Sequence, residues 1–133
     1  MTSLVLDTHA VIWHLCDSSR LSPSARAAIG STTEGGSPAF VSAITVAEVT
    51  YLVEKGRLQK GQLTALLMAL RRPDSDLRVQ PVDLAVAEAL GRIPRSAVPD
   101  LPDRIIAATA LHLGLPLVTI DHRLRSCGLP TIW

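Results

Sequence analysis

Cysteines and aromatic residues are scarce in this sequence. Its 133 residues include two Cys, two Trp, one Tyr and one Phe. Cys16 and Cys127 form no spacing typical of a zinc site, and two cysteines are too few for a disulfide-rich scaffold. We therefore expect a protein of a reducing, cytoplasmic compartment. A chain of this length can bury a hydrophobic core without disulfides or a structural metal. Residues 1–133 suit a single domain.

Long hydrophobic runs are also missing. The longest stretch without Asp, Glu, Lys or Arg covers residues 105–120, and Gly114 and Pro116 interrupt it. This stretch is shorter than a membrane-spanning helix. The first residues lack a basic segment and include Asp7, so we expect no signal peptide. Together these absences predict a soluble protein.

Neither sign of charge dominates the chain. Thirteen Lys and Arg face 12 Asp and Glu, which gives a formal net charge of +1. This balance excludes a polybasic or acidic tail as the basis of function. It does not by itself indicate a nucleic-acid partner, so the positions of the charges matter more than their sum.

Short apolar segments typical of strands alternate with helical segments along the chain. We expect strands over residues 3–6, 39–42, 77–82, 117–120 and 129–133. Helices are expected over residues 10–15, 23–29, 44–54, 62–70, 84–90 and 105–113, with loops over 31–37 and 94–102. Glycines at positions 30, 56, 91 and 114 are the expected helix ends. This order predicts a three-layer α/β/α fold with a central, mostly parallel sheet of four to five strands.

Two expected strands end in aspartate, at Asp7 and Asp121. Ligands of parallel sheets bind outside the carboxyl ends of the strands, and both side chains belong to that edge. Asp also commonly caps a following helix or turn, so each residue alone has a structural explanation. The two residues together favour a functional site.

Glu48 lies in an otherwise apolar helical segment, on one stripe with Ile44, Tyr51 and Leu52. A carboxylate in such a place is costly unless it is paired, hydrated or bound to a metal. The alternative is a helix rotated so that Glu48 reaches solvent.

Asp100 and Asp103 stand at the start of the helical segment that continues through residue 113. Asp100 suits the N-cap position, with Asp103 as the third helical residue. Asp103 then shares a face with Ile106, Ala107 and Ala110, which we expect to be buried. We assign capping to Asp100 and function to Asp103.

Four carboxylates that converge cannot all be ionised without a counter-charge. A hard divalent cation with oxygen ligands, Mg²⁺ or Mn²⁺, is the ordinary solution. Such a metal can activate water and neutralise charge on a phosphate during hydrolysis. The expected metal ligands and catalytic residues are Asp7, Glu48, Asp103 and Asp121.

Four stretches of the chain and its last residue carry a family resemblance. Residues 4–13, 21–29, 42–58 and 100–124, together with Trp133, resemble the PIN-domain ribonucleases, specifically the VapC-type toxins of bacterial toxin–antitoxin pairs. The order and spacing of these stretches carry the resemblance, while residues 59–99 hold no motif. It implies a metal-dependent endoribonuclease that leaves a 5′-phosphate and a 3′-hydroxyl on RNA. It also implies a growth-inhibiting homodimer that a small cognate antitoxin blocks.

The resemblance assigns roles to single residues. Asp7, Glu48, Asp103 and Asp121 match the four acidic positions of the family in that order. Thr119 matches a hydroxyl position, where it would orient a carboxylate or a metal-bound water. Thr8 and Ser42 are weaker candidates for the same supporting role. Arg104 and Arg123 are candidates for binding the substrate phosphate, since each lies beside an expected metal ligand.

Other residues have a structural explanation that we prefer. The four histidines, at positions 9, 14, 112 and 122, have no common ligand spacing, although His122 lies next to Asp121. Trp13 and Trp133 could stack on bases, but packing is the simpler role. The apolar face of Leu66, Leu67 and Leu70 suits the core, a dimer interface or an antitoxin groove.

Three other functions compete with a VapC-like toxin. A PIN nuclease of RNA processing would share the same site. An aspartyl-phosphate phosphatase needs a second Asp where His9 stands, and a phospho-receiver needs a Lys after a late strand, whereas the lysines are Lys55 and Lys60. A non-catalytic nucleic-acid module would not need the four carboxylates. Setting those four aside leaves eight acidic residues against 13 basic ones, which predicts an acidic pocket bordered by arginines.

Overall fold

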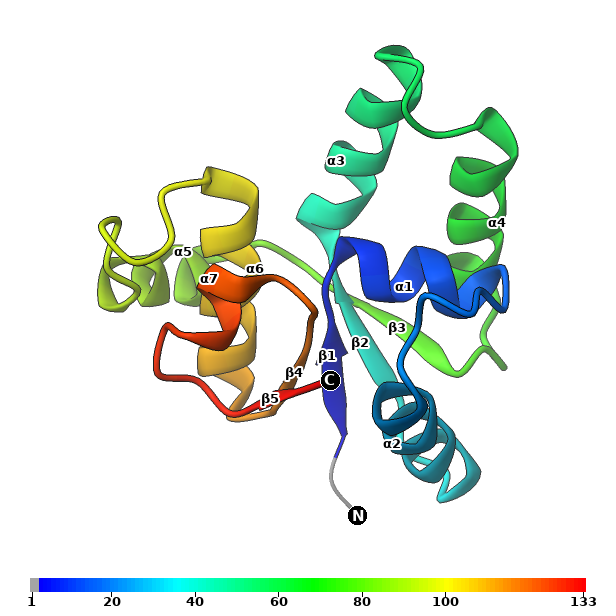
Figure 1. Ribbon diagram of the computed structural model, residues 1–133, viewed down its shortest axis with the longest axis horizontal. Helices are drawn as coiled ribbons and strands as arrows, with labels where there is room; N and C mark the ends of the chain where they lie inside the picture. Colours follow the sequence, from blue (N-terminus) through cyan, green and yellow to red (C-terminus); the bar gives the residue numbers. More distant parts are fainter. Residues whose placement is uncertain (1–2) are drawn as a thin grey trace.

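The computed structural model describes residues 3–133, in which a parallel sheet is covered by helices on both faces (Figure 1). The strands are β1 (Leu4–Leu6), β2 (Ala39–Ser42), β3 (Leu77–Gln80), β4 (Leu117–Val118) and β5 (Thr131–Ile132). Their spatial order is β3-β2-β1-β4-β5, and every neighbouring pair is parallel. The expected α/β/α architecture is confirmed.

The central strand β1 divides the core into two halves. Its three residues are all buried, as expected for a strand covered on both faces. Because side chains alternate along a strand, Leu4 and Leu6 belong to one hydrophobic cluster and Val5 to the other. The carboxyl end of this strand is therefore fixed from both sides, and Asp7 follows it directly.

Each cluster is completed by its own set of helices. The first cluster takes side chains from α1 (Thr8–Leu15), α2 (Pro23–Glu34), α3 (Ala43–Glu54) and α4 (Lys60–Arg71). The second takes them from α5 (Leu84–Ala89), α6 (Leu101–Leu113) and α7 (His122–Arg125), with the short 3-10 helix η1 (Leu90–Arg92) following α5. Figure 1 shows these two helix groups on opposite sides of the sheet.

The apolar face of α4 belongs to the core at two of its three expected positions. Leu66 is fully buried, and Leu70 packs against the same cluster. Leu67 is half-buried, whereas Met68 is 60% exposed. The core explanation of this face therefore holds for Leu66 and Leu70.

Several boundaries differ from the sequence prediction. Helix α2 continues through Gly30 to Glu34, so residues 31–34 are helical and not part of a loop. The buried Ile29 and Thr32 hold this helix to the core on both sides of Gly30, and the chain turns only at Gly36, where φ is +84°. Helix α6 begins at Leu101, which agrees with Asp100 as its N-cap and places Pro102 in the first turn, whereas the loop was expected to extend to residue 102.

Other element boundaries differ as well. Helix α1 begins at Thr8, two residues earlier than expected, and β4 ends at Val118, two residues before the expected end. The sequence did not predict α7, whose four residues follow Asp121. Within residues 3–133, no helix is both long and apolar enough to cross a membrane.

Candidate metal centre

Asp7 and Asp121 lie where β1 and β4 end, at the same edge of the sheet. Both also cap helices: Asp7 Oδ1 accepts a hydrogen bond from the Ala10 N–H at 2.9 Å, and Asp121 Oδ1 accepts one from the Leu124 N–H at 3.0 Å. The capping explanation is therefore correct for each residue. It does not exclude a second role, because a carboxylate has a further oxygen and further lone pairs.

Thr119 connects these two aspartates. Its Oγ1 donates a hydrogen bond to Asp7 Oδ2 at 2.5 Å and accepts one from the backbone N–H of Asp121 at 3.0 Å. Thr119 is fully buried and lies one residue beyond β4. The sequence prediction that this hydroxyl orients a carboxylate agrees with these contacts.

Glu48 reaches the same edge of the sheet from α3. Its Oε1 accepts a hydrogen bond from Thr8 Oγ1 at 2.6 Å, and Thr8 Oγ1 lies 3.2 Å from Thr45 Oγ1. A hydroxyl has a single hydrogen, so Thr8 uses its own on Glu48 and must accept from Thr45. One buried hydroxyl thus holds the carboxylate oxygen, and a second buried hydroxyl holds the first. Glu48 itself is partly exposed, which falls between the two orientations considered from the sequence.

Thr45 is a site residue that the sequence prediction missed. It lies three residues before Glu48 and so on the same helix face, which is the signal that could have identified it. Thr8 makes a direct contact with Glu48, a closer role than the sequence indicated. Ser42 is buried but its Oγ accepts from the Ile44 N–H, so it caps α3 and supports Glu48 only through that helix.

Asp103 has a strongly raised pKa. Burial and the negative charges around it raise its pKa from 3.8 to about 7. The neighbours that contribute charge are, in decreasing order, Asp100, Asp121, Glu48 and Asp7. Asp100 caps α6 as predicted, accepting at Oδ2 from the Asp103 N–H at 3.1 Å. The four expected site residues therefore share one electrostatic environment, although they come from four elements.

Asp7 is the most buried of the four, with 5% of its surface exposed. Burial raises its pKa, and the negative charge of Asp121 adds to the effect. The hydrogen bonds from Thr119 and Ala10 and the nearby His9 act in the opposite direction. The net result is a carboxylate that is costly to ionise unless a cation accompanies it.

Among the residues that the structure describes, no side-chain cation is paired with these carboxylates. The single ion pair recorded among residues 3–133 joins Arg26 to Asp17, on the surface. Hard carboxylate oxygens without a paired cation match the ligands that Mg²⁺ and Mn²⁺ prefer. Within the same residues, no three His, Cys, Asp or Glu side chains are grouped closely enough to enclose a metal directly. The donor type therefore suits such a cation, whereas the described side chains form no complete set of metal ligands.

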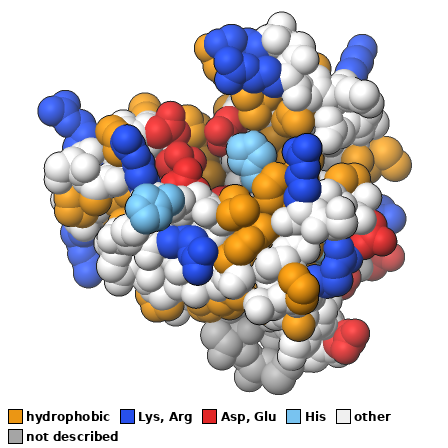
Figure 2. Space-filling model, in the orientation of Figure 1, with side chains coloured by type: hydrophobic (Ala, Val, Ile, Leu, Met, Phe, Trp, Pro, Cys, Tyr) orange, Lys and Arg blue, Asp and Glu red, His pale blue; other side chains and the backbone are white. Residues whose placement is uncertain are grey.

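The surface around the carboxylates is hollowed and mixed in charge. Figure 2 shows acidic side chains gathered in the hollow between α3 and the α6–α7 side of the molecule, with histidine and basic side chains near them. Other basic side chains lie at the outline of this view, so basic residues border the hollow without being confined to it.

The two arginines expected at the substrate phosphate differ in their contacts. Arg104 Nε donates to the Ile93 carbonyl and its Nη2 to the Leu90 carbonyl, both at 3.0 Å. This arginine therefore ties α6 to the segment after α5. Arg123 is exposed on α7, two residues after Asp121, and has no such contact among the described residues. The expectation of a phosphate contact therefore remains for Arg123.

Trp13 and Trp133 pack together as expected, with ring centroids 5.8 Å apart and both side chains against the core.

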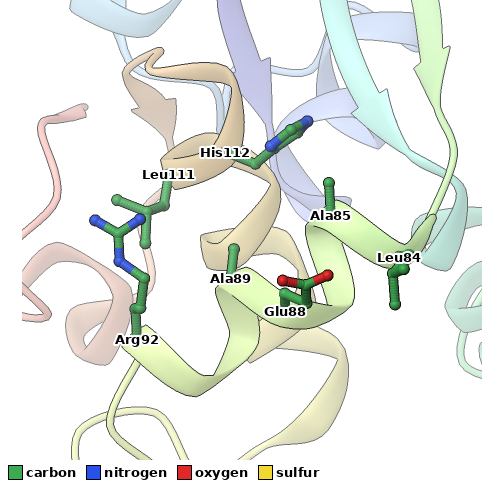
Figure 3. Close-up of a pocket in the computed structure, with 7 residues that line it drawn as sticks. All are labelled: Leu84, Ala85, Glu88, Ala89, Arg92, Leu111 and His112. Atoms are coloured by element: carbon green, nitrogen blue, oxygen red, sulfur yellow. The ribbon is translucent and has the colours of Figure 1, made fainter.

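A pocket of about 560 Å³ lies elsewhere, between α5 and the end of α6 (Figure 3). Glu88, Arg92 and His112 are its polar lining residues, and none of the four clustered carboxylates lines it. The acidic centre, not this pocket, unites the residues that the sequence singled out.

Comparison with known proteins agrees with the fold. The PIN domain family matches residues 4–128, and the chain belongs to this family. Within it, the chain is a homologue of the VapC ribonucleases. It is 35% identical over 136 residues to Ribonuclease VapC22 from Mycobacterium tuberculosis (strain ATCC 25618 / H37Rv), and the alignment covers both proteins completely.

Solved structures share the fold at lower sequence identity. VapBC2 from Rickettsia felis, bound to a DNA fragment from its promoter, matches with a TM-score of 0.70 and 18% identity over 98% of this chain and 97% of that chain. A toxin–antitoxin complex from Klebsiella pneumoniae matches with a TM-score of 0.63 and 23% identity over 98% and 96% of the two chains. These likenesses extend over nearly the whole chain.

Proposed function

We propose that this chain is a metal-dependent endoribonuclease that hydrolyses phosphodiester bonds in RNA. The observation that supports this most is the convergence of Asp7, Glu48, Asp103 and Asp121, where burial, and after it the charges of Asp100 and of the other three carboxylates, raise the pKa of Asp103 to about 7. The full-length likeness to a ribonuclease agrees with it. The proposed cofactor is Mg²⁺ or Mn²⁺, held by these four residues directly or through water.

The residues around the proposed metal have distinct roles. The bound cation would activate water and neutralise charge on the phosphate. Thr119 fixes both the Asp7 side chain and the backbone at Asp121, and Thr8 fixes Glu48, so the carboxylates are oriented before substrate binds. Arg123 is the proposed contact of the substrate phosphate. Burial of Asp7 excludes bulk water from the inner end of the site.

We further propose that the chain is a toxin, restrained by a small antitoxin and acting as a homodimer. The names of its structural neighbours support the antitoxin, since they describe VapBC2 and a toxin–antitoxin complex. A growth assay separates this role from RNA processing. Induced expression should arrest growth, and the Asp7→Asn chain should not; normal growth with an active nuclease would favour a processing enzyme.

RNA cleavage tests the enzymatic proposal. Purified chain is incubated with total RNA in Mg²⁺, in Mn²⁺ and in EDTA, beside Asp7→Asn, Glu48→Gln, Asp103→Asn and Asp121→Asn. Each amide variant keeps the size of the side chain but loses its charge. We expect cleavage only with metal, and a loss of at least about a hundredfold in each variant, since metal and ligands act as a unit. Equal cleavage by Asp7→Asn or in EDTA would contradict the proposal.

A further inference from the structure

A second pocket, of about 660 Å³, lies beside α1 and extends to the loop before α4. We call it the α1 pocket and define it by His9, Trp13, Arg20, Arg57, Gln59 and Gln62 among its lining residues. Its volume is in the range of ~300–1,000 Å³ that holds small organic ligands. His9 lines the pocket and lies near enough to Asp7 of the candidate metal centre for its charge to lower the pKa of that carboxyl.

The charge of the α1 pocket is opposite to that of the metal centre. Its lining includes Arg20 and Arg57 and no Asp or Glu. Both arginines are exposed, and in the described part of the chain neither guanidinium has a recorded carboxylate or carbonyl partner. Arginine binds phosphate through paired N–H donors. The pocket is therefore suited to an anionic group.

Aromatic rings form another wall of the pocket. The His9 and Trp13 ring centroids are 5.6 Å apart, and Trp133 lies 5.8 Å from Trp13 on the core side. Trp13 is thus held in place, while His9 is exposed. Gln62 Oε1 accepts from the Gln59 N–H at 2.8 Å, so its NH₂ group remains available as a donor. Flat rings beside hydrogen-bond donors and cations are the combination that binds nucleotides of single strands.

We propose that the α1 pocket binds one nucleotide of a single-stranded RNA, next to the phosphodiester bond held at the metal centre. The base stacks on His9 and Trp13, and the phosphate contacts Arg20 and Arg57. This inference rests on the proposed nuclease function. An acidic protein segment could use the arginines, but RNA uses the arginines and the rings together and continues directly to the metal centre past His9.

Binding of RNA in the absence of cleavage tests the pocket. The Asp7→Asn chain is titrated against a fluorescein-labelled single-stranded RNA of mixed sequence at several salt concentrations. Arg20→Ala and Arg57→Ala are added to this chain, and Arg92→Ala is the matched control, since it removes an exposed arginine from the pocket between α5 and α6. We expect each pocket variant to bind roughly three- to tenfold more weakly and to lower the salt slope by about 0.7, and the control to change neither.

Substitutions of His9 test the aromatic wall of the pocket. His9→Ala should weaken binding several-fold, by loss of stacking, and His9→Phe should restore it. RNA containing 4-thiouridine, irradiated with the same Asp7→Asn chain, should crosslink to peptides that include residues 9–20 or 57–62. Crosslinks confined to other peptides would overturn the inference. So would arginine variants that behave like Arg92→Ala, which is the result expected if the pocket holds a protein segment.

The nuclease proposal is read separately, by cleavage of the same RNA with the unsubstituted chain in Mg²⁺. Pocket-dependent binding without cleavage would refute the nuclease and keep the binding site. If the unsubstituted chain cleaves the RNA but the pocket substitutions leave RNA affinity unchanged, the binding site alone is refuted.

Discussion

Thr119 Oγ1 donates a hydrogen bond to Asp7 Oδ2 across 112 residues of sequence. The same oxygen accepts from the Asp121 N–H, so one buried hydroxyl fixes two residues of the acidic centre. No main-chain group could make both contacts, because an N–H only donates and a carbonyl only accepts. Thr119 therefore determines how β4 presents its carboxyl end to Asp7.

Replacing Thr119 with Val should harm both stability and metal binding. The substitution keeps the shape but leaves the Asp121 N–H and Asp7 Oδ2 without their partner, which costs about 1–3 kcal/mol of unfolding free energy. Loss of such a supporting contact typically weakens metal binding ~10–100-fold. Urea denaturation and Mn²⁺ titration measure the two effects. Thr119→Ser keeps the hydroxyl and should lie close to the unsubstituted protein; equal losses in both variants would show that the methyl group matters instead.

Substitutions of Thr8 and of Thr45 should differ in their effects on metal affinity and on stability. Thr8→Val removes the donor to Glu48, whereas Thr45→Val removes only the donor to Thr8. We expect Thr8→Val to reduce metal affinity by about tenfold or more, and Thr45→Val to reduce it less while costing roughly 1 kcal/mol in stability. Metal titration and denaturation of both variants measure this order. A larger loss of metal affinity in Thr45→Val would contradict the chain of hydrogen bonds.

The pH dependence of the metal-free protein should report Asp103. Its pKa is about 7 in the folded state and 3.8 ordinarily, so between these values the folded protein keeps a proton that the unfolded chain has released. Its contribution to stability is full below about pH 4 and is lost as the pH rises through about 7. Thermal unfolding from about pH 5 to about pH 8 should therefore show a falling Tm without metal, and saturating Mg²⁺ should reduce the fall.

Asp103→Asn is the control for this profile. Its Tm should fall less over the same pH range, and the difference from the unsubstituted protein isolates Asp103. Such a difference is needed because burial lowers the pKa of His14, whose contribution to stability grows as the pH rises and so has the opposite sign. Identical profiles for the two proteins would show that Asp103 is not the titrating group.

Substitution of Arg104 should lower stability, whereas substitution of Arg123 should weaken RNA binding. Arg104→Ala removes two hydrogen bonds to the Leu90 and Ile93 carbonyls and should cost about 1–3 kcal/mol of unfolding free energy. Arg123→Ala should leave stability within about 0.5 kcal/mol, since the residue is exposed, but weaken RNA binding and lower its salt slope. Denaturation and RNA titration of both variants decide the assignment. A stable Arg104→Ala chain with weakened RNA binding would reverse it.

The sequence predicted the elements best where local signals and packing agree. Asp83 caps α5 and Gly114 ends α6 with φ +66°, as their residue types indicate. Gly30 misled the prediction because a glycine inside a helix costs only about 1 kcal/mol, which burial of its neighbours outweighs. Helix α7 is too short to show a periodic pattern, so only its cap at Asp121 was visible in the sequence.

The four carboxylates and the supporting residues Thr119 and Thr8 were named from the sequence and its family resemblance, but Thr45 and the individual hydrogen-bond partners were not. A carboxylate after a strand, or within an apolar helix, is recognisable because it is costly there. The hydrogen bond between Thr8 and Glu48 depends on how α1 and α3 pack, which no local pattern encodes. The role of Arg104 depends likewise on the path of the chain after α5. Long-range side-chain contacts therefore account for most of what the structure adds.

The order of the strands has a consequence for the timing of synthesis. β1 is made first, yet it lies in the middle of the sheet and needs β4, one of the last strands, as its neighbour. Thr119 and Asp121 accompany β4, so the acidic centre is incomplete until residues 117–121 have left the ribosome. The proposed nuclease would thus be inert while the preceding strands are being made, and the messenger RNA that encodes it would be spared during that time.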